Sequence, residues 1–289
     1  MITRRCTQRQ FLLRPDPELN NAFLYCLAEA ATRFAIEILF TLANSNHHHT
    51  GIYDPNGCYP AFLEHFHKLL AKCGNALRGR WENFWASEQT SVVHLVEPQD
   101  VLGKMVYALT NPVKDHLVER AHHWPGVSAL RAILDDKPIS ATRPRCFFRE
   151  EGPMPETVTL RFARPAGFEH LGRAEWRQLV EDRIASAEAE AGDERRSNGG
   201  RVLGRATVLR QSWRDRPSSN EPRRGLSPRV AGRSKWRRME ALLRNRAFIA
   251  SYRSARDQFL RGVRDALFPA GSYFLPRFAG ALCAPANHH

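Results

Sequence analysis

The order of hydrophobic patterns in residues 1–125 limits the possible folds more than any other feature of the chain. Short apolar runs typical of strands alternate with longer stretches in which apolar residues recur at helical spacing. Strands are predicted over 7–13, 34–42, 47–53 and 90–96, and helices over 18–33, 59–77 and 98–110. The order β-α-β-β-α-β with a trailing helix is the split βαβ arrangement. It predicts an α+β protein in which helices cover one face of an antiparallel sheet and leave the other free for a ligand.

The remaining sequence divides into two further segments. Residues 126–200 contain a proline-spaced linker, a predicted strand over 158–162 and a predicted helix over 174–191, and are expected to be a linker and accessory region. Residues 201–289 open with an Arg-Pro-rich loop and continue into a long basic amphipathic segment over 235–267. The expected organisation is therefore a first domain over 1–125 followed by a mixed, basic C-terminal extension.

The positive charge of the chain is concentrated in its last third. The formal net charge is +13, and 43 of the 289 residues are Lys or Arg. Residues 201–289 hold 19 basic and 5 acidic side chains, whereas residues 1–130 hold 12 of each. Because guanidinium groups match phosphate oxygens in geometry, this distribution indicates a polyanionic partner such as nucleic acid.

Membrane and secreted proteins are disfavoured by the composition. No apolar run approaches the roughly 20 residues that span a bilayer, and the opening residues contain no apolar core typical of a secretory signal. The six cysteines form no CxxC pair, so we expect reduced thiols and a cytoplasmic protein that does not contact membranes.

A histidine cluster, NHHHT at 46–50, falls on a predicted strand. Side chains alternate between the faces of a strand, so His47 and His49 should lie on one face and His48 on the other. Two neutral imidazoles at this spacing can bind one divalent cation, although a surface cluster of histidines is an equal alternative.

A tyrosine on the last predicted helix of this segment is a second candidate for chemistry. Tyr107 lies in KMVYALTNPVKDHLV, and Asn111, four residues later, should share its helical face. A phenol can act as a covalent nucleophile towards a phosphodiester when a metal withdraws charge from the phosphate. A tyrosine taken alone is more often a packing residue.

Together these segments resemble the single-tyrosine HUH transposases of small insertion sequences and their relatives, the REP-associated tyrosine transposases. The resemblance covers about residues 1–125 and rests on SNHHHTGIYDP, LRGRWENFW, VVHLV and VYALTNPVKDHLV in that order. It implies a ferredoxin-like HUH nuclease fold, with His47 and His49 as metal ligands, Asn111 as a third ligand and Tyr107 as nucleophile. The implied cofactor is Mg²⁺ or Mn²⁺.

The resemblance further implies a transposase, a DNA strand transferase that cleaves and rejoins single-stranded hairpin DNA. Tyr107 would form a 5′-phosphotyrosine link and release a 3′-hydroxyl, without ATP. The family includes monomers and dimers, so the resemblance is compatible with either a monomer or a homodimer. The chain departs from the family pattern at His48, where the family has a hydrophobic residue, and at Thr50. A buried polar side chain without a partner costs about 1–3 kcal/mol.

That departure and the added basic C-terminal segment motivate an alternative: a domesticated protein that binds hairpin DNA without cleaving it. A second alternative is a metal-dependent hydrolase in which water is the nucleophile.

Basic and aromatic side chains near these motifs are candidates for DNA contact. The candidates for binding phosphate are Arg78, Arg80, Lys114, Arg244 and Arg253. Trp81, Phe84 and Trp85 could stack on unpaired bases, but core packing is the favoured interpretation.

Overall fold

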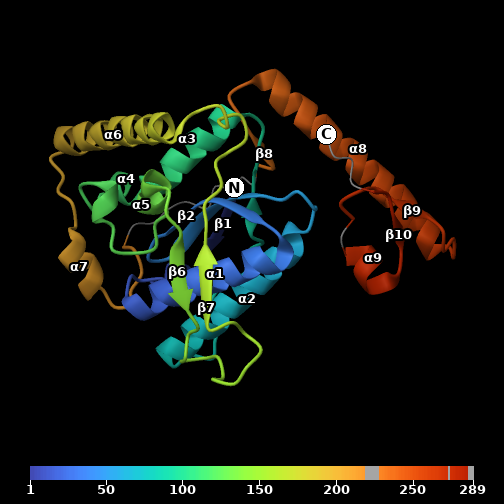
Figure 1. Ribbon diagram of the computed structural model, residues 1–289, viewed down its shortest axis with the longest axis horizontal. Helices are drawn as coiled ribbons and strands as arrows, with labels where there is room; N and C mark the ends of the chain where they lie inside the picture. The colour runs from blue at the N-terminus through green and yellow to red at the C-terminus, as the bar shows by residue number, and fades with distance from the viewer. Residues whose placement is uncertain (219–227, 273, 286–289) are drawn as a thin grey trace.

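Four strands from the first hundred residues form an antiparallel sheet in the order β2-β3-β1-β4 (Figure 1). The computed structural model describes residues 1–218, 228–272 and 274–285. The strands are β1 (Ile2–Arg5), β2 (Glu37–Ala43), β3 (His47–Tyr53) and β4 (Ser91–Val92). Helices connect and cover them, so the chain is a mixed α+β protein, as predicted.

The first two long helices confirm their sequence predictions. Helix α1 (Pro17–Phe34) begins at Asp16, whose carboxylate accepts a hydrogen bond from the Leu19 amide at 2.8 Å. Helix α2 (Tyr59–Arg78) ends at Gly79, which adopts the left-handed conformation (φ 60°) that favours glycine. The two helices pack on each other against the sheet.

The first strand was predicted in the wrong place. The prediction of 7–13 followed the apolar residues at its end, but the extended segment is β1, which pairs with β3 and β4. A single 3₁₀ turn, η1 (Thr7–Arg9), follows β1, and both Gln8 (φ 49°) and Arg9 (φ 59°) are left-handed. A left-handed residue cannot continue a strand. Phe11 to Leu13 are therefore buried as a loop.

Two other strand predictions needed smaller corrections. β2 begins at Glu37 rather than residue 34, because α1 continues to Phe34 and Ala35 ends it in the left-handed conformation. The predicted strand over 90–96 is two short strands. β4 joins the sheet, and β5 (His94–Leu95) pairs in parallel with β8 (Val230–Ala231) from the C-terminal third.

Both faces of the sheet are covered, which corrects the expectation of a free face. One core lies between the sheet and α1 and α2. The second core forms on the other side from β2, α3 (Pro98–Leu109) and the helices that follow. These are α4 (Asn111–Lys114), η2 (Ala121–His123), α5 (Leu130–Asp135), α6 (Arg173–Ser197) and α7 (Arg205–Arg210).

Residues 126–200 pack closely on the first segment. A hairpin of β6 (Ile139–Thr142) and β7 (Thr157–Leu160) lies across α1 (Figure 1). The β7 prediction was close to the observed strand, whereas β6, which lies just before the proline-spaced stretch over 143–156, was missed. Ala141 and Leu160 belong to the same core as α1 and α2.

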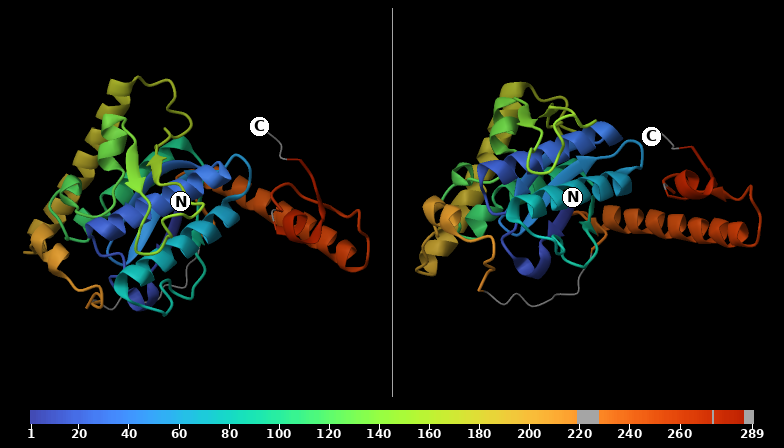
Figure 2. Two further views of the ribbon diagram at one scale, coloured as in Figure 1. Left: turned by 60° about the horizontal axis from the view of Figure 1, so that its bottom comes forward. Right: turned by 90° about the horizontal axis from the view of Figure 1, so that it is seen from below.

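The C-terminal third forms an arm that extends away from the sheet (Figure 2). Helix α8 (Lys235–Leu260) is the arm, and β9 (Leu267–Phe268), α9 (Phe274–Ala279) and β10 (Leu282–Cys283) follow it. The predicted amphipathic segment extended to residue 267, but the helix ends at Leu260 and Gly262 turns the chain with a φ of 95°. Among the described residues, no helix combines the length and apolar character needed to cross a bilayer.

Candidate functional site

The three consecutive histidines of β3 alternate between the faces of the sheet. The rings of His47 and His49 lie on the side of α3, with centroids 4.9 Å apart. His48 points to the opposite side, against Phe23 of α1 and Phe66 of α2. Strand periodicity therefore brings the first and third imidazoles together.

His47 is held in one orientation by asparagines on both sides. Its Nδ1 lies 2.7 Å from Asn46 Oδ1, which can only accept, so Nδ1 carries the proton. The lone pair is then on Nε2, which receives a hydrogen bond from Asn44 Nδ2 at 3.1 Å. Burial, with Arg5 contributing, lowers the pKa of His47 to about 4, so the ring is neutral near pH 7.

His49 has one ring nitrogen bonded and the other unpartnered. Its Nδ1 lies 2.9 Å from Thr3 Oγ1 on β1. Its Nε2 is buried without a hydrogen-bond partner. Burial, with smaller effects of His47 and Lys104, lowers the pKa of His49 to about 3, so this ring is also neutral near pH 7. An unpartnered buried nitrogen is costly unless it meets a ligand.

Asn111 brings an amide oxygen to the same place. It is the first residue of α4, is 6% exposed, and its Oδ1 accepts a hydrogen bond from Asn44 Nδ2. The same Asn44 Nδ2 group donates to His47 Nε2, so one amide group links the two side chains. The short helix exists because Pro112 interrupts the preceding helix at Thr110, and this break directs Asn111 towards β3.

Tyr107 of α3 lies beside these groups and is flanked by two lysines. Its ring centroid is 5.8 Å from that of His49 in an edge-on arrangement. Lys104 Nζ and Lys114 Nζ each lie 5.1 Å from the Tyr107 ring centroid. The side chain is 37% exposed, so a substrate can reach it. Lys114 was predicted from the sequence, whereas Lys104 was missed, although its position one helical turn before Tyr107 could have indicated it.

The nitrogen and oxygen donors fit a divalent metal. In metal sites, a ligating histidine donates its other ring N–H to an oxygen. His47 follows this pattern towards Asn46, and His49 makes the corresponding contact with Thr3. The amide oxygen suits Mg²⁺ or Mn²⁺ when water and phosphate oxygens complete the set, and neutral imidazole nitrogen is a good donor to divalent transition metals. In residues 1–218, 228–272 and 274–285, no group of three or more His, Cys, Asp or Glu is arranged to hold a metal. The oxygen donor beside the two histidines is the amide of Asn111.

The polar residue at the middle of the histidine cluster is fully satisfied. His48 is buried, and its Nε2 lies 3.0 Å from His67 Nε2 on α2. Its Nδ1 lies 3.0 Å from Thr50 Oγ1, which in turn bonds Thr41 Oγ1 at 2.9 Å. The two departures from the family pattern, His48 and Thr50, are therefore partners of each other.

A cleft of about 550 Å³ opens beside His47, here called the His47 cleft. Its wall on the side of the sheet includes Arg5 and Arg9, and its far wall comes from residues 211–218. Asn44 lines it and has a buried Oδ1 without a hydrogen-bond partner. No local pattern in the sequence indicates that residues more than a hundred positions downstream complete this cleft.

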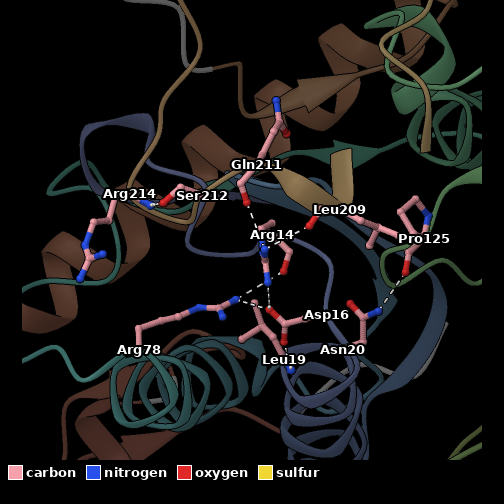
Figure 3. Close-up of polar contacts among 10 residues, drawn as sticks. All are labelled: Arg14, Asp16, Leu19, Asn20, Arg78, Pro125, Leu209, Gln211, Ser212 and Arg214. Atoms are coloured by element: carbon pink, nitrogen blue, oxygen red, sulfur yellow. Dashed lines mark hydrogen bonds and ion pairs between the residues drawn. The ribbon is translucent and has the colours of Figure 1, made fainter. Parts of the chain in front are cut away.

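Arg78, predicted to bind DNA, instead stabilises the start of α1 (Figure 3). Its guanidinium is 7% exposed and forms an ion pair with Asp16. Arg14 pairs with the same carboxylate at 3.4 Å and donates to the carbonyls of Leu209 and Gln211, both at 3.1 Å. This contact holds residues 209–211 against the body, so Arg78 supports the cleft wall indirectly and is not presented to a phosphate.

Arg80 lies at the edge of the cleft region. Its guanidinium donates to Gln10 Oε1 at 3.0 Å and lies 5.6 Å from the Trp213 ring centroid. The neighbouring aromatic residues divide into two kinds, since Phe84 is buried whereas Trp81 is 95% exposed. The prediction of core packing was therefore correct for Phe84 and wrong for Trp81.

Arg244 and Arg253 are exposed on α8, the arm that extends away from the sheet (Figure 2). The fold therefore brings together His47, His49, Asn111, Tyr107 and Lys114, but not these two arginines. They stay predicted DNA contacts. Comparison of the chain with protein-family models, with curated proteins and with solved structures found no match.

Proposed function

We propose that this protein is a metal-dependent DNA strand transferase that cleaves and rejoins single-stranded DNA through Tyr107. The observation that carries the proposal is the convergence of two neutral histidines, one amide oxygen and one accessible tyrosine at a single site. The strand order β2-β3-β1-β4 is the one that a split βαβ arrangement produces, which agrees with the ferredoxin-like sheet of the HUH transposases that the sequence resembles.

The residues have distinct roles in the proposed reaction. His47 Nε2, His49 Nε2 and Asn111 Oδ1 would hold Mg²⁺ or Mn²⁺, which when bound withdraws charge from the reacting phosphate. The Tyr107 oxygen attacks phosphorus, the bond from phosphorus to the 3′-oxygen breaks, and the phenol proton is balanced by the proton that the 3′-oxygen gains. Lys104 and Lys114 contribute positive charge beside the ring.

The phosphotyrosine bond retains the energy of the phosphodiester, so the released or another 3′-hydroxyl can reverse the step. No nucleotide cofactor is needed for rejoining. The retained bond energy accounts for transfer of the DNA strand to a 3′-hydroxyl rather than hydrolysis, when water is kept from the phosphate linked to Tyr107.

A non-cleaving hairpin binder was the alternative that His48 and the basic C-terminal segment motivated, His48 through the energetic cost of burying a polar side chain. The hydrogen bonds of His48 to His67 and Thr50 remove that energetic cost. Cleavage is therefore the favoured proposal.

The test is covalent capture of labelled hairpin DNA on a denaturing gel in the presence of Mn²⁺. The wild-type protein is expected to give a band that survives denaturant. Tyr107→Phe should abolish it, while Tyr53→Phe, at another exposed tyrosine, should not. His49→Ala should reduce it at least a hundredfold, in contrast to His122→Ala at an exposed histidine. Absence of a covalent band under all these conditions would contradict the proposal.

A further inference from the structure

A second hollow adjoins the His47 cleft. The second hollow, here called the Arg214 hollow, has a volume of about 410 Å³. It is lined by Gln8 and Gln10 on one side and by residues 214–216 on the other. Asp215 and Arg216 line both cavities, so the two share a wall. The two adjoining cavities are here called the depression, and its first part lies beside His47 of the candidate metal site.

This depression is basic along its length. Arg5 and Arg9 line the His47 cleft, and Arg214 lines the Arg214 hollow. Arg216 lines both cavities. Asp115 and Asp215 are the acidic side chains in the linings of the two cavities. The Asp215 carboxylate accepts a hydrogen bond from the Ser212 amide at 3.1 Å, which fixes the local turn.

The far wall is anchored rather than loosely placed. Besides the contact of Arg14 with the Leu209 and Gln211 carbonyls, the Phe11 amide donates to the Asp215 carbonyl at 2.9 Å. Trp213 lies 4.5 Å from the Arg214 guanidinium carbon and 5.6 Å from that of Arg80, measured to its ring centroid. Aromatic contact orients both planar guanidinium groups at the far end.

Two independent features on the near wall favour a binding function. Asn44 Oδ1 is buried, unpartnered and part of the lining of the His47 cleft. Gln8 and Arg9 hold left-handed backbone conformations that side chains of this size rarely adopt, and each lines one of the cavities. Such strained positions gather at ligand sites.

We infer that the single strand attached to the reacting phosphate lies in the His47 cleft and continues through the Arg214 hollow. This rests on the proposed function for the position of the reacting phosphate, and assigns the path of the flanking nucleotides to residues 5–10 and 211–216. Arginine contacts to successive phosphates, including those of Arg214 and Arg216, hold the strand.

The test is fluorescence anisotropy of a labelled, unstructured 12-nucleotide DNA with full-length Tyr107→Phe protein in EDTA, so that binding is measured without cleavage. The double variant Arg214→Ala/Arg216→Ala is expected to bind at least tenfold more weakly. The slope of log Kd against log salt concentration should fall by about 1.4, because each phosphate contact on a single strand contributes about 0.7. Circular dichroism checks that the variant is folded.

The matched control is Arg161→Ala/Arg183→Ala, which removes two exposed arginines that line neither cavity. It should stay within twofold of the parent protein. Equal weakening by both double variants would overturn the inference. DNA binding would then depend on the net charge of the protein and not on arginines that line the two cavities. Undetectable binding of the parent protein, or tenfold preference for RNA of the same sequence, would also overturn it. Intact binding through these residues without covalent capture on the gel would contradict the proposed reaction alone.

Discussion

Removing the carboxylate from the ion pair between Asp16 and Arg78 should strongly destabilise the fold, because it leaves the Arg78 charge buried without its partner. In Asp16→Ala, α1 loses the side chain that caps the Leu19 amide, which costs about 1 kcal/mol. The Arg78 guanidinium, 7% exposed, also loses its carboxylate partner, and removing one member of a buried pair costs about 3–5 kcal/mol. Since Arg78 keeps a contact of 3.5 Å with the Arg14 carbonyl, the lower end applies. We expect a total loss of about 3–4 kcal/mol.

Urea denaturation followed by circular dichroism measures this loss. Asp16→Asn keeps an oxygen for the cap and removes the charge, so we expect it to lose about 2–3 kcal/mol. Asp193→Ala removes a carboxylate of the exposed pair with Arg196 and should change the free energy of unfolding by less than about 0.5 kcal/mol. A loss below about 1 kcal/mol in Asp16→Ala would refute the assignment of Arg78 to a structural role and return it to the candidates for phosphate contact.

Three further predictions concern other parts of the chain. Trp81→Ala should leave the free energy of unfolding within about 0.5 kcal/mol of wild type in urea, because the ring is 95% exposed. Gly51→Ala should destabilise the sheet by about 1–3 kcal/mol in the same assay, because the added Cβ would overlap the ring of Phe40. Burial lowers the pKa of His67 to about 3, whereas an unfolded histidine titrates near 6.5, so the unfolded chain binds more protons between these values. Stability should therefore fall as the pH drops from about 6.5 to 4, with about 1.4 kcal/mol per pH unit from His67, and His67→Gln should show a correspondingly shallower slope.

The sequence predicted those features that depend on neighbouring residues. Helix α1 was found because Asp16 and Pro17 mark its start, and the alternation of a strand placed His47 and His49 on one face. In each case the information lies within a few positions of the residue concerned.

Features that depend on distant segments could not be predicted in this way. The far wall of the His47 cleft comes from residues 211–218, and its attachment to Arg14 and Phe11 has no local signal. The hydrogen-bond partners of His48 are His67 on helix α2 and Thr50 on its own strand β3. Arg78 was predicted to bind phosphate because it lies in a basic, aromatic motif. In the structure its guanidinium pairs instead with Asp16, more than sixty positions earlier.

The site of covalent attachment tests the central claim most directly. After incubation with single-stranded hairpin DNA and Mn²⁺, nuclease treatment and trypsin digestion, mass spectrometry should find the peptide 105–114 carrying a nucleotide phosphate on Tyr107. Fragmentation should locate the added mass on the tyrosine rather than on Thr110. DNA that is cut while this peptide stays unmodified would contradict the account, because water rather than Tyr107 would then be the nucleophile.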